Sequence, residues 1–463
     1  MVAKFITCFS ATLALLAVVN PAGAEPYPST YTPMPSDPVL IVNAIILTGT
    51  GERISNGNLL MANGIIEAVS EDAIRKIKGN YQTIDAEDRW VTPGLIDVHS
   101  HLGVYASPGV QAHSDGNEAT APVTAEVWAE HSIWPQDPGF NRALAGGVTT
   151  LQILPGSANL IGGRGVTLKN VRATSYQAMK FPGAPYGLKM ACGENPKRYY
   201  GAKGQAPSTR MGNVAGYRAQ WIEAKKYIRD WAAYEELLAS DDTEARAGAT
   251  SPVRDLRLET LAGVLKGEIL VQMHCYRADE MMTVLDMARE FDYRVSTFHH
   301  AVEAYKIADE LAAAGVCGAM WADWWGFKAE AYDGIPENIA LVDRPEGGCA
   351  IVHSDSELGI QRLNQEAAKA MTSGQRAGMD SSPKTAIRWI TSNAAKSLGI
   401  LEQTGTIEPG KMADIVIWNG NPFSVYAKAD QVFIDGALVY DRSDPEYQPV
   451  SDFELGLQAE ESP

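Results

Sequence analysis

Cysteine is scarce in this chain. Only five of the 463 residues are cysteines, and no two of them form a Cys-x-x-Cys pair. This absence excludes a metal site built on a cysteine knuckle. One cysteine lies among the first ten residues, and the other four lie in apolar, strand-like stretches: Cys192, Cys275, Cys317 and Cys349. We expect these four to be buried as small apolar side chains rather than joined in disulfides.

Positive charge is also in short supply. Lysine and arginine total 39 against 56 aspartates and glutamates, so the formal net charge is -17. A chain this acidic repels the phosphates of nucleic acids and of anionic lipids. We therefore expect a small-molecule substrate, with no nucleic acid and no membrane among the partners. A homo-oligomer remains open.

The apolar run at the start of the chain is too short to span a membrane comfortably. Lys4 precedes this run, which covers residues 5–19, and small residues follow at 22–24. Such a pattern is typical of a secretory signal peptide. We expect a signal peptide over residues 1–24, a mature chain that begins near Glu25, and a secreted or periplasmic protein.

The rest of the chain predicts an α/β protein. With 45% hydrophobic residues and 42 glycines, it can bury a large core. Short strands and turns fill residues 38–93 and 406–445, so both ends are expected to form one small β-sandwich domain. Residues 94–405 alternate apolar strands with helical patterns, which predicts a TIM-type (β/α)8 barrel. Residues 446–463 form an acidic tail. Strands are expected at 148–154, 187–191, 269–274, 294–298, 316–321 and 350–353, and helices at 215–238, 278–291 and 303–314.

Two histidines end the first expected barrel strand. After a Pro-Gly break, an apolar strand over residues 95–98 leads into His99 and His101. Side chains two residues apart on a strand point to the same side, so both imidazoles can reach one metal ion. The pair lies at the carboxyl end of the strand, which is where barrel enzymes carry their chemistry. The pattern predicts that both histidines bind a metal.

With this motif the sequence resembles the amidohydrolase superfamily of metal-dependent hydrolases. In that family the first barrel strand carries Pro-Gly-(hydrophobic)-Ile-Asp-x-His-x-His, which residues 93–101 match. Residues 391–399 and 405–418 resemble the family's closing signature. The resemblance covers nearly the whole chain after the N-terminus and looks most like the imidazolonepropionase and N-acetylglucosamine-6-phosphate deacetylase branches. It implies the same composite of a barrel and a β domain, in an exported member.

Two later apolar strands also end in histidine, one at His274 and the other at His299 and His300. A single histidine at a strand end is more often structural. Together with the first pair, however, these positions form a constellation that suits zinc, as one ion or two. The resemblance favours His300 over His299, because similar family members place the metal histidine immediately before a small residue, here Ala301.

The last expected strand delivers Asp355 to the same rim. Taken alone, Asp355 or its neighbour Ser354 could simply cap a helix. In the amidohydrolase superfamily the matching aspartate contacts the metal and accepts a proton from the water that attacks the substrate carbonyl. The resemblance therefore implies that Asp355 is both a metal ligand and the catalytic general base.

A second metal ion would need a bridging ligand on an intermediate strand. In the family this ligand is commonly a carbamylated lysine or a glutamate. Lys189 and Glu194 both lie in the expected stretch. Glu194 resembles the glutamate of the sugar-deacetylase-like branches, whereas Lys189 would serve if the strand ended earlier. We prefer Glu194 and keep Lys189 as the alternative.

These residues together predict hydrolysis of a carbon–nitrogen amide bond by a metal-activated water. Dipeptides, N-acyl amino acids and cyclic amides are all suitable substrates. The alternatives are a ring deaminase, a lactonase or a metal-binding barrel without turnover. Deamination is less favoured because related deaminases place a glutamate three residues after the fifth-strand histidine, where this chain has Arg277. Retention of Asp355 argues against a mere binding protein.

Three residues are candidates for substrate binding. Arg277 could pair with a substrate carboxylate, although a surface arginine at a helix start is an equally good interpretation. Arg164 lies in a glycine-rich segment, 160–165, that could present amides and a guanidinium to an anion. A flexible turn is the more ordinary interpretation of that segment. Trp325 follows a barrel strand and could wall an apolar pocket.

Overall fold

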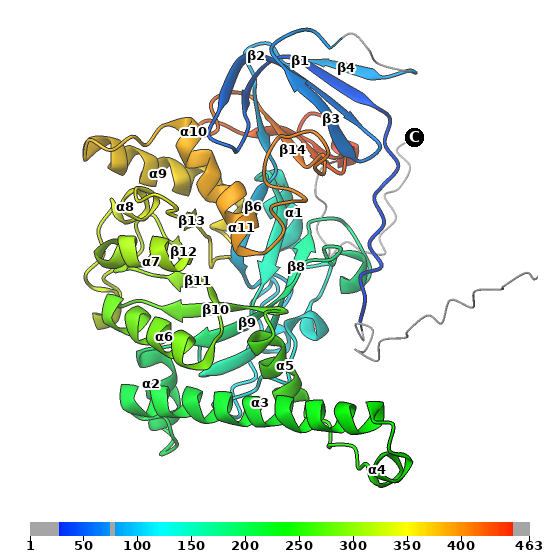
Figure 1. The fold of residues 1–463 in the computed structure, drawn as a ribbon. Helices are drawn as coiled ribbons and strands as arrows, with labels where there is room; N and C mark the ends of the chain where they lie inside the picture. Colours follow the sequence, from blue (N-terminus) through cyan, green and yellow to red (C-terminus); the bar gives the residue numbers. More distant parts are fainter. Residues whose placement is uncertain (1–26, 75–78, 448–463) are drawn as a thin grey trace, which may run out of the picture.

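The computed structural model describes residues 27–74 and 79–447. The expected signal peptide (1–24) lies outside the described residues, as does nearly all of the expected acidic tail. The described chain has two eight-stranded sheets, of which one forms a barrel with helices around it and the other lies above the barrel in Figure 1. The predicted α/β barrel with a β domain built from both chain ends is confirmed.

The barrel sheet has eight strands in the order β13-β12-β11-β10-β9-β8-β7-β6. Its strands are buried along almost their whole length, as strands covered on both faces must be. Beyond β13, the backbone N–H of Asp355 donates to the carbonyl of His99 at 3.0 Å, which joins the last strand end to the first. The strands are β6 (Leu95–Ser100), β7 (Val148–Ile153), β8 (Ile161–Lys169), β9 (Tyr186–Ala191), β10 (Ile269–Cys275), β11 (Val295–His300), β12 (Cys317–Met320) and β13 (Ala350–Val352).

Strand β8 departs from the prediction. It pairs antiparallel with both β7 and β9, whereas the sequence suggested a turn at 160–165 and a wholly parallel barrel. The glycines of this segment serve close packing rather than a turn. A Cβ on Gly163 would lie 2.4 Å from the carbonyl oxygen of Val127, and one on Gly165 would lie 2.5 Å from the Leu154 side chain. Composition alone does not separate a glycine-rich strand from a glycine-rich turn.

Helices cover the outside of the barrel and one extends away from it. Helices α6 to α9 lie along strands β10 to β13 on the left of Figure 1, and α3 crosses below the barrel and carries α4 past its edge. The predicted helix at 278–291 is α6, that at 215–238 is part of α3, and that at 303–314 divides into a 3-10 turn and α7. The helices are α1 (Pro138–Ala145), α2 (Glu194–Gly201), α3 (Arg210–Ala239), α4 (Thr243–Gly248), α5 (Leu256–Leu265), α6 (Ala278–Phe291), α7 (Ala308–Ala314), α8 (Asn338–Asp343), α9 (Leu363–Arg376), α10 (Pro383–Ala386) and α11 (Ser392–Ser397).

The second sheet joins the two ends of the chain. Strand β14 pairs antiparallel with β5, and β5 lies parallel to β1. An apolar core lines this sheet, and Lys169 at the end of β8 ties it to the barrel through buried ion pairs with Asp414 at 3.2 Å and Asp435 at 2.7 Å. The strands are β1 (Val39–Leu47), β2 (Arg53–Ala62), β3 (Ile65–Ser70), β4 (Gln82–Asp85), β5 (Trp90–Pro93), β14 (Ile415–Trp418), β15 (Ala429–Ile434) and β16 (Ala437–Asp441).

The four cysteines of the described chain form two disulfides, which corrects the expectation of free buried thiols. Cys192 bonds Cys275 and Cys317 bonds Cys349. Each disulfide joins neighbouring strands, β9 to β10 and β12 to β13, so the bonded Cα atoms lie only 5.2 and 4.6 Å apart. Sequence spacing does not say which strands are neighbours, and this is why the pairing was missed.

Loss of the Cys192–Cys275 disulfide should destabilise the barrel. It closes a separation of 83 residues, and cross-links of that span restrict the unfolded chain strongly. We expect the double substitution Cys192→Ser, Cys275→Ser to lower the free energy of unfolding by about 2–4 kcal/mol in a denaturant titration. Thiol labelling of the unreduced, denatured wild-type protein is the companion measurement. Labelling of these two cysteines there would contradict the bond.

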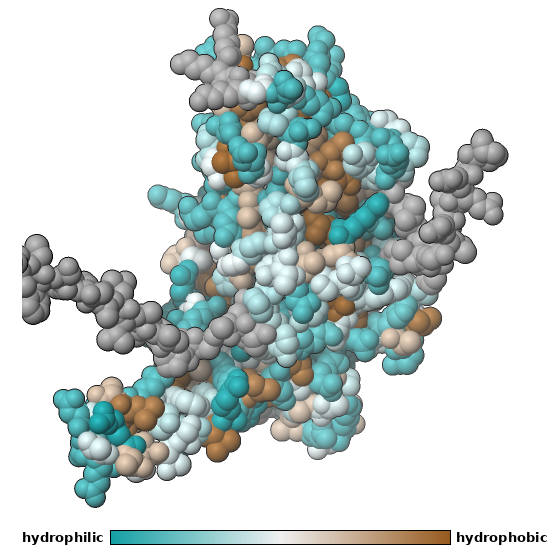
Figure 2. Space-filling model, turned by 90° about the vertical axis from the view of Figure 1, so that its right-hand side faces the viewer, coloured by the Kyte–Doolittle hydropathy of each residue, from teal (hydrophilic) through white to brown (hydrophobic). Residues whose placement is uncertain are grey.

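The surface offers no extended apolar face in the view of Figure 2. Hydrophilic residues dominate that view, and hydrophobic ones form small separate groups. Among the residues described, no helix combines the length and the apolar composition that crossing a bilayer demands.

Candidate metal centre

Histidines from four barrel strands meet at the carboxyl ends of those strands. Six of the eight histidines in the chain lie there, and two sets of them, one with Asp355, bring potential ligand atoms within 4.8 Å of one another. The six are His99 and His101 from β6 and its end, His274 from β10, His299 and His300 from β11, and His353 just after β13. The two sets are His99, His300 and His353, and His99, His101 and Asp355.

Asp355 lies where three of these side chains converge. Its Oδ1 is 3.2 Å from His101 Nε2 and 3.5 Å from His99 Nε2, and its Oδ2 is 3.8 Å from His300 Nδ1. The Asp355 side chain retains 23% exposure, so it faces both the histidines and solvent. Burial raises the pKa of Asp355, but the contact with His101 and nearby positive charge lower it by more, and the net pKa is below its ordinary value.

The protonation of His99 follows from a chain of hydrogen bonds behind it. Gln272 Oε1 is an acceptor 2.8 Å from His299 Nε2, so that nitrogen carries a hydrogen and His299 Nδ1 is left as an acceptor. His99 Nδ1 lies 3.0 Å from His299 Nδ1 and therefore donates to it. His99 Nε2 is then free of hydrogen and faces Asp355, as a metal ligand must be.

A hydrogen bond also determines which ring nitrogen of His101 carries a hydrogen. Its Nδ1 donates to the carbonyl oxygen of Leu154 at 2.8 Å, because that oxygen can only accept. The Nε2 atom of His101 is left without hydrogen and faces Asp355. Both histidines of the first strand thus present a lone pair to the same place.

The remaining histidines are buried with nitrogens that lack hydrogen-bond partners. His274 and His353 have no partner for either ring nitrogen, and His300 has none for Nδ1. Burial lowers the pKa of His274 and His300 well below the ordinary value and that of His353 to about 4, so all three are neutral near pH 7. Neutral, buried and unpartnered imidazoles are costly unless something binds them, and these residues therefore fit a divalent metal ion.

The backbone is strained where these ligands lie. His300, Ala301 and Asp355 have positive φ angles of 69°, 30° and 49°, which residues with a side chain rarely adopt. Such conformations persist only where the surroundings enforce them, and they concentrate at functional sites. Trp321 packs against the His300 ring, with ring centroids 4.3 Å apart, and fixes its orientation.

The comparisons with known proteins agree with this geometry. The family described as Amidohydrolase family matches residues 351–439. A crystal structure of an amidohydrolase from Thermotoga maritima MSB8 is 34% identical, covers 87% of this chain and all of its own, and superposes with a TM-score of 0.77.

This chain belongs to the amidohydrolase family.

Two curated relatives extend the comparison. Amidohydrolase tasK of Hapsidospora irregularis is 31% identical over 87% of this chain, and the match takes in 43% of that longer protein. An imidazolonepropionase of Mesorhizobium japonicum is 25% identical over 79% of this chain and 87% of its own length. As an amidohydrolase, the chain is a hydrolase that acts on carbon–nitrogen bonds and belongs to a family that uses divalent metals.

In this amidohydrolase Lys189, not the preferred Glu194, lies beside the histidines. Lys189 Nζ is 3.3 Å from His99 Nε2 and donates to the carbonyl of Pro155 at 2.9 Å. Burial lowers its pKa to about 8. Glu194 instead begins helix α2 and lies 3.5 Å from Lys328 Nζ. Strand β9 ends at Ala191, so Lys189 is the one of these two residues that the strand places beside His99, and the alternative given to Lys189 gains support.

Two of the three substrate-binding candidates have other partners. Arg164 is on strand β8, where Nε donates to Thr260 Oγ1 at 2.8 Å and the guanidinium covers the Trp128 ring at 4.0 Å. Arg277 forms a two-point ion pair with Asp279 at 2.9 and 3.0 Å. Both guanidinium groups are thus engaged with other residues of the protein, and substrate binding by either arginine stays a prediction.

Trp325, the third candidate, does lie near the cluster. It lines a small crevice together with His300, Trp321 and Trp324. This places an aromatic wall on one side of the histidines.

Sequence reasoning missed two members of the cluster. His353 precedes Asp355 by two residues, so the spacing argument used for His99 and His101 would have found it. His299 was set aside in favour of His300, yet it supports His99 from behind. Only the barrel interior, where β10 brings Gln272 alongside β11, reveals that role.

Removing the support behind His99 should weaken metal binding without removing a ligand. We expect His299→Gln to lower metal affinity about 10- to 100-fold, the usual loss when such a supporting contact is removed. Competition with a chromogenic chelator measures the metal affinity. His131→Asn, which changes an exposed histidine outside the cluster, is the matched control. Unchanged affinity in a folded His299→Gln protein would show that the contact does not orient His99.

Proposed function

We propose that this amidohydrolase hydrolyses an amide bond of a small substrate, with zinc held by the strand-end cluster and Asp355 as the residue that moves the proton. The observation that carries the proposal is the placement of Asp355. Its carboxylate lies within 3.8 Å of nitrogens from three histidines and remains open to solvent on one side. A binding site alone would not need a carboxylate in that position.

The proposed ligands are neutral nitrogens and one carboxylate, a set that suits zinc. They are His99, His101, His274, His300 and Asp355, with His353 beside them. We propose one ion, and a second only where Lys189 is converted to a carbamate. Its pKa of about 8 supports that possibility, because carbamylation needs the neutral amine.

The proposed reaction assigns each proton to an atom. When bound, zinc polarises the amide carbonyl and lowers the pKa of a nearby water toward about 7. The Asp355 carboxylate takes one proton from water as the water oxygen bonds to the carbonyl carbon. As the carbon–nitrogen bond breaks, Asp355 returns that proton to the leaving nitrogen. The products are a carboxylic acid and an amine.

Ring deamination is the less favoured alternative. It requires an acid that protonates a ring nitrogen, and the position expected for that acid is occupied by Arg277. Arg277 pairs with Asp279 and presents no carboxylate of its own. Lactone hydrolysis needs the same attack of water on a carbonyl carbon, and lactones are therefore included in the substrate panel described below.

We also propose that the protein acts outside the cytoplasm. Two disulfides join neighbouring barrel strands, and structural disulfides persist chiefly in oxidising compartments. This supports the export that the N-terminal pattern predicts. Detection of the mature protein in the periplasm or medium, with an N-terminus near Glu25, is the test.

A substrate panel with product identification tests the reaction. Zinc-loaded protein is incubated with dipeptides, N-acetyl and N-formyl amino acids, cyclic amides, lactones and amino-substituted ring compounds. Release of free amine together with a carboxylic acid supports the proposal. Ammonia from the ring compounds, or turnover of lactones alone, would replace it with one of the alternatives.

A further inference from the structure

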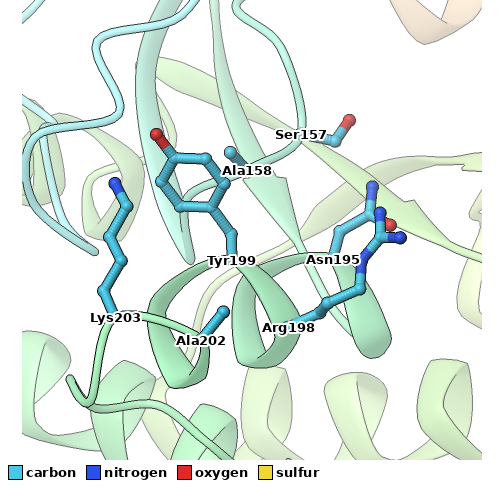
Figure 3. A pocket seen from close by; sticks show the side chains of 7 residues that line it. All are labelled: Ser157, Ala158, Asn195, Arg198, Tyr199, Ala202 and Lys203. Atoms are coloured by element: carbon cyan, nitrogen blue, oxygen red, sulfur yellow. The ribbon is translucent and has the colours of Figure 1, made fainter.

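A pocket of about 470 Å³ lies between helix α2 and the loop that follows β7. The helix and the residues just after it contribute Asn195, Arg198, Tyr199 and Lys203, and the loop contributes Ser157. In Figure 3 the side chains from the helix reach across the pocket toward this loop. The proposed hydrolytic mechanism does not use this pocket.

Contacts on the helix side lead from the pocket to the metal centre. Asn195 Oδ1 accepts a hydrogen bond from Lys328 Nζ at 2.8 Å. The same Lys328 nitrogen lies 4.1 Å from the centroid of the Tyr276 ring, and that ring lies 4.7 Å from the ring of His274. Asn195 is therefore separated from a proposed metal ligand by only two side chains.

Contacts on the loop side lead to the same place. Ser157 follows Pro155 by two residues, and the Pro155 carbonyl accepts a hydrogen bond from Lys189 Nζ at 2.9 Å. Lys189 Nζ in turn lies 3.3 Å from His99 Nε2. Two short chains of contacts, one from each wall, thus connect the pocket to the metal centre.

Unpaired positive charge lines the pocket. The side chains of Arg198 and Lys203 are exposed, and neither hydrogen-bonds or pairs with an acid anywhere in residues 27–74 and 79–447. Lys203 lies over the Tyr199 ring at 3.9 Å. The Ser157 hydroxyl and the Asn195 amide add neutral donors. Two unpaired cations with hydrogen-bond donors beside them are a typical arrangement for binding an anion.

We propose that this pocket binds the carboxylate of the substrate, with Arg198 as the residue that pairs with it. This rests on the proposed function and narrows it. The substrate is then an amide that carries a free carboxylate, such as a dipeptide or an N-acyl amino acid, whose amide bond reaches the cluster while its carboxylate lies against Arg198. Neutral cyclic amides lack the group that the pocket recognises.

A carboxylate fits this pocket better than a phosphate. Arginine presents two parallel N–H groups that match the two oxygens of a carboxylate. Negative charge is already present at the pocket's inner edge, where Glu194 lies 3.5 Å from Lys328 Nζ and Glu330 accepts from the Glu194 backbone N–H at 2.9 Å. A singly charged ligand is repelled less by these carboxylates than a doubly charged one.

The test compares substrates that differ only in the carboxylate. Dipeptides and N-acetyl amino acids covering a range of side chains are each paired with the same compound as its C-terminal carboxamide. Turnover is followed by amine release, and binding by calorimetry on the metal-loaded protein. Wild type is compared with Arg198→Gln, Arg198→Lys and, as the matched control, Arg229→Gln on an exposed face of α3.

We expect wild type to prefer the carboxylate member of each pair. In Arg198→Gln this preference should fall about 10- to 100-fold, as expected for loss of a hydrogen bond to a charged group. Arg198→Lys should restore only part of it, since lysine cannot make the two-point contact. Arg229→Gln should behave as wild type does.

The outcomes separate this proposal from the one it rests on. Equal binding and turnover of carboxylate and carboxamide by wild type, or an unchanged preference in Arg198→Gln, would overturn the carboxylate site and leave amide hydrolysis intact. Absence of both binding and turnover across the whole panel would also overturn it. If inorganic phosphate inhibits binding of the carboxylate substrates more strongly than acetate does at equal concentration, the assignment of the pocket to a carboxylate is wrong. Amide hydrolysis itself fails only if the metal-loaded protein cleaves no amide of any kind.

Discussion

Asp355→Asn should reduce amide turnover about 10²- to 10⁴-fold, the range lost when a general acid–base group is removed. Asparagine has nearly the same shape as aspartate, but its amide neither takes a proton from water nor returns one to the leaving nitrogen. Metal content should stay close to that of wild type, because four histidines of the proposed ligand set remain. The measurement is kcat for amine release together with metal per chain.

The control for this substitution is Asp286→Asn. Asp286 is exposed on helix α6 and pairs with Arg289, outside the cluster. It should leave both kcat and metal content unchanged. Substantial turnover by a metal-loaded Asp355→Asn protein would assign the proton transfer to another group, and the mechanism proposed for Asp355 would be wrong.

His99→Asn combined with His101→Asn should remove the metal and with it all amide hydrolysis. These two side chains carry the nitrogens closest to Asp355, at 3.5 and 3.2 Å, and the bonds to His299 and Leu154 prepare both as ligands. The expected result is a folded protein that retains less than about one-tenth of the wild-type metal after dialysis, since two of the five proposed ligands are lost. Elemental analysis measures the metal content per chain.

The double substitution His113→Asn, His131→Asn is the matched control. Both histidines lie outside the strand-end cluster, so the same number of imidazoles is lost without loss of a proposed ligand. This control should keep its metal. Full metal content in the His99, His101 variant would place the metal elsewhere in the chain.

Much of the fold could be predicted from the sequence because its signals are local. An apolar strand that ends in His99 and His101 specifies both the strand and the side to which its histidines point. The short strands at both chain ends predicted a separate sheet, and the pairing of β14 with β5 joins the two ends in that sheet. In these cases the residues that carry the signal are also the residues that form the structure.

The features that were missed depend on which strands are neighbours. The two disulfides form because β9 lies beside β10 and β12 beside β13, and no spacing within the sequence contains that fact. The support of His99 by His299 depends on β6 and β11 facing each other across the barrel. The choice of Glu194 depended on a strand boundary, which shifts easily by a few residues.

His353 is a different kind of omission. It lies two residues before Asp355, just after the last strand, and extending the alternation of side chains along that strand predicts both on one side. The same local signal identifies His99 and His101. Its burial and its unpartnered ring nitrogens place it among the residues that a metal would satisfy.

The measurement that tests the central claim most directly is a zinc titration of the metal-free protein, followed by amine release from an amide substrate identified in the panel. We predict no hydrolysis without metal, a rate that rises in proportion to bound zinc, and a maximum at one or two ions per chain. Hydrolysis at the full rate by protein stripped of metal would contradict the account, as would stoichiometric zinc binding at the cluster with no hydrolysis of any amide.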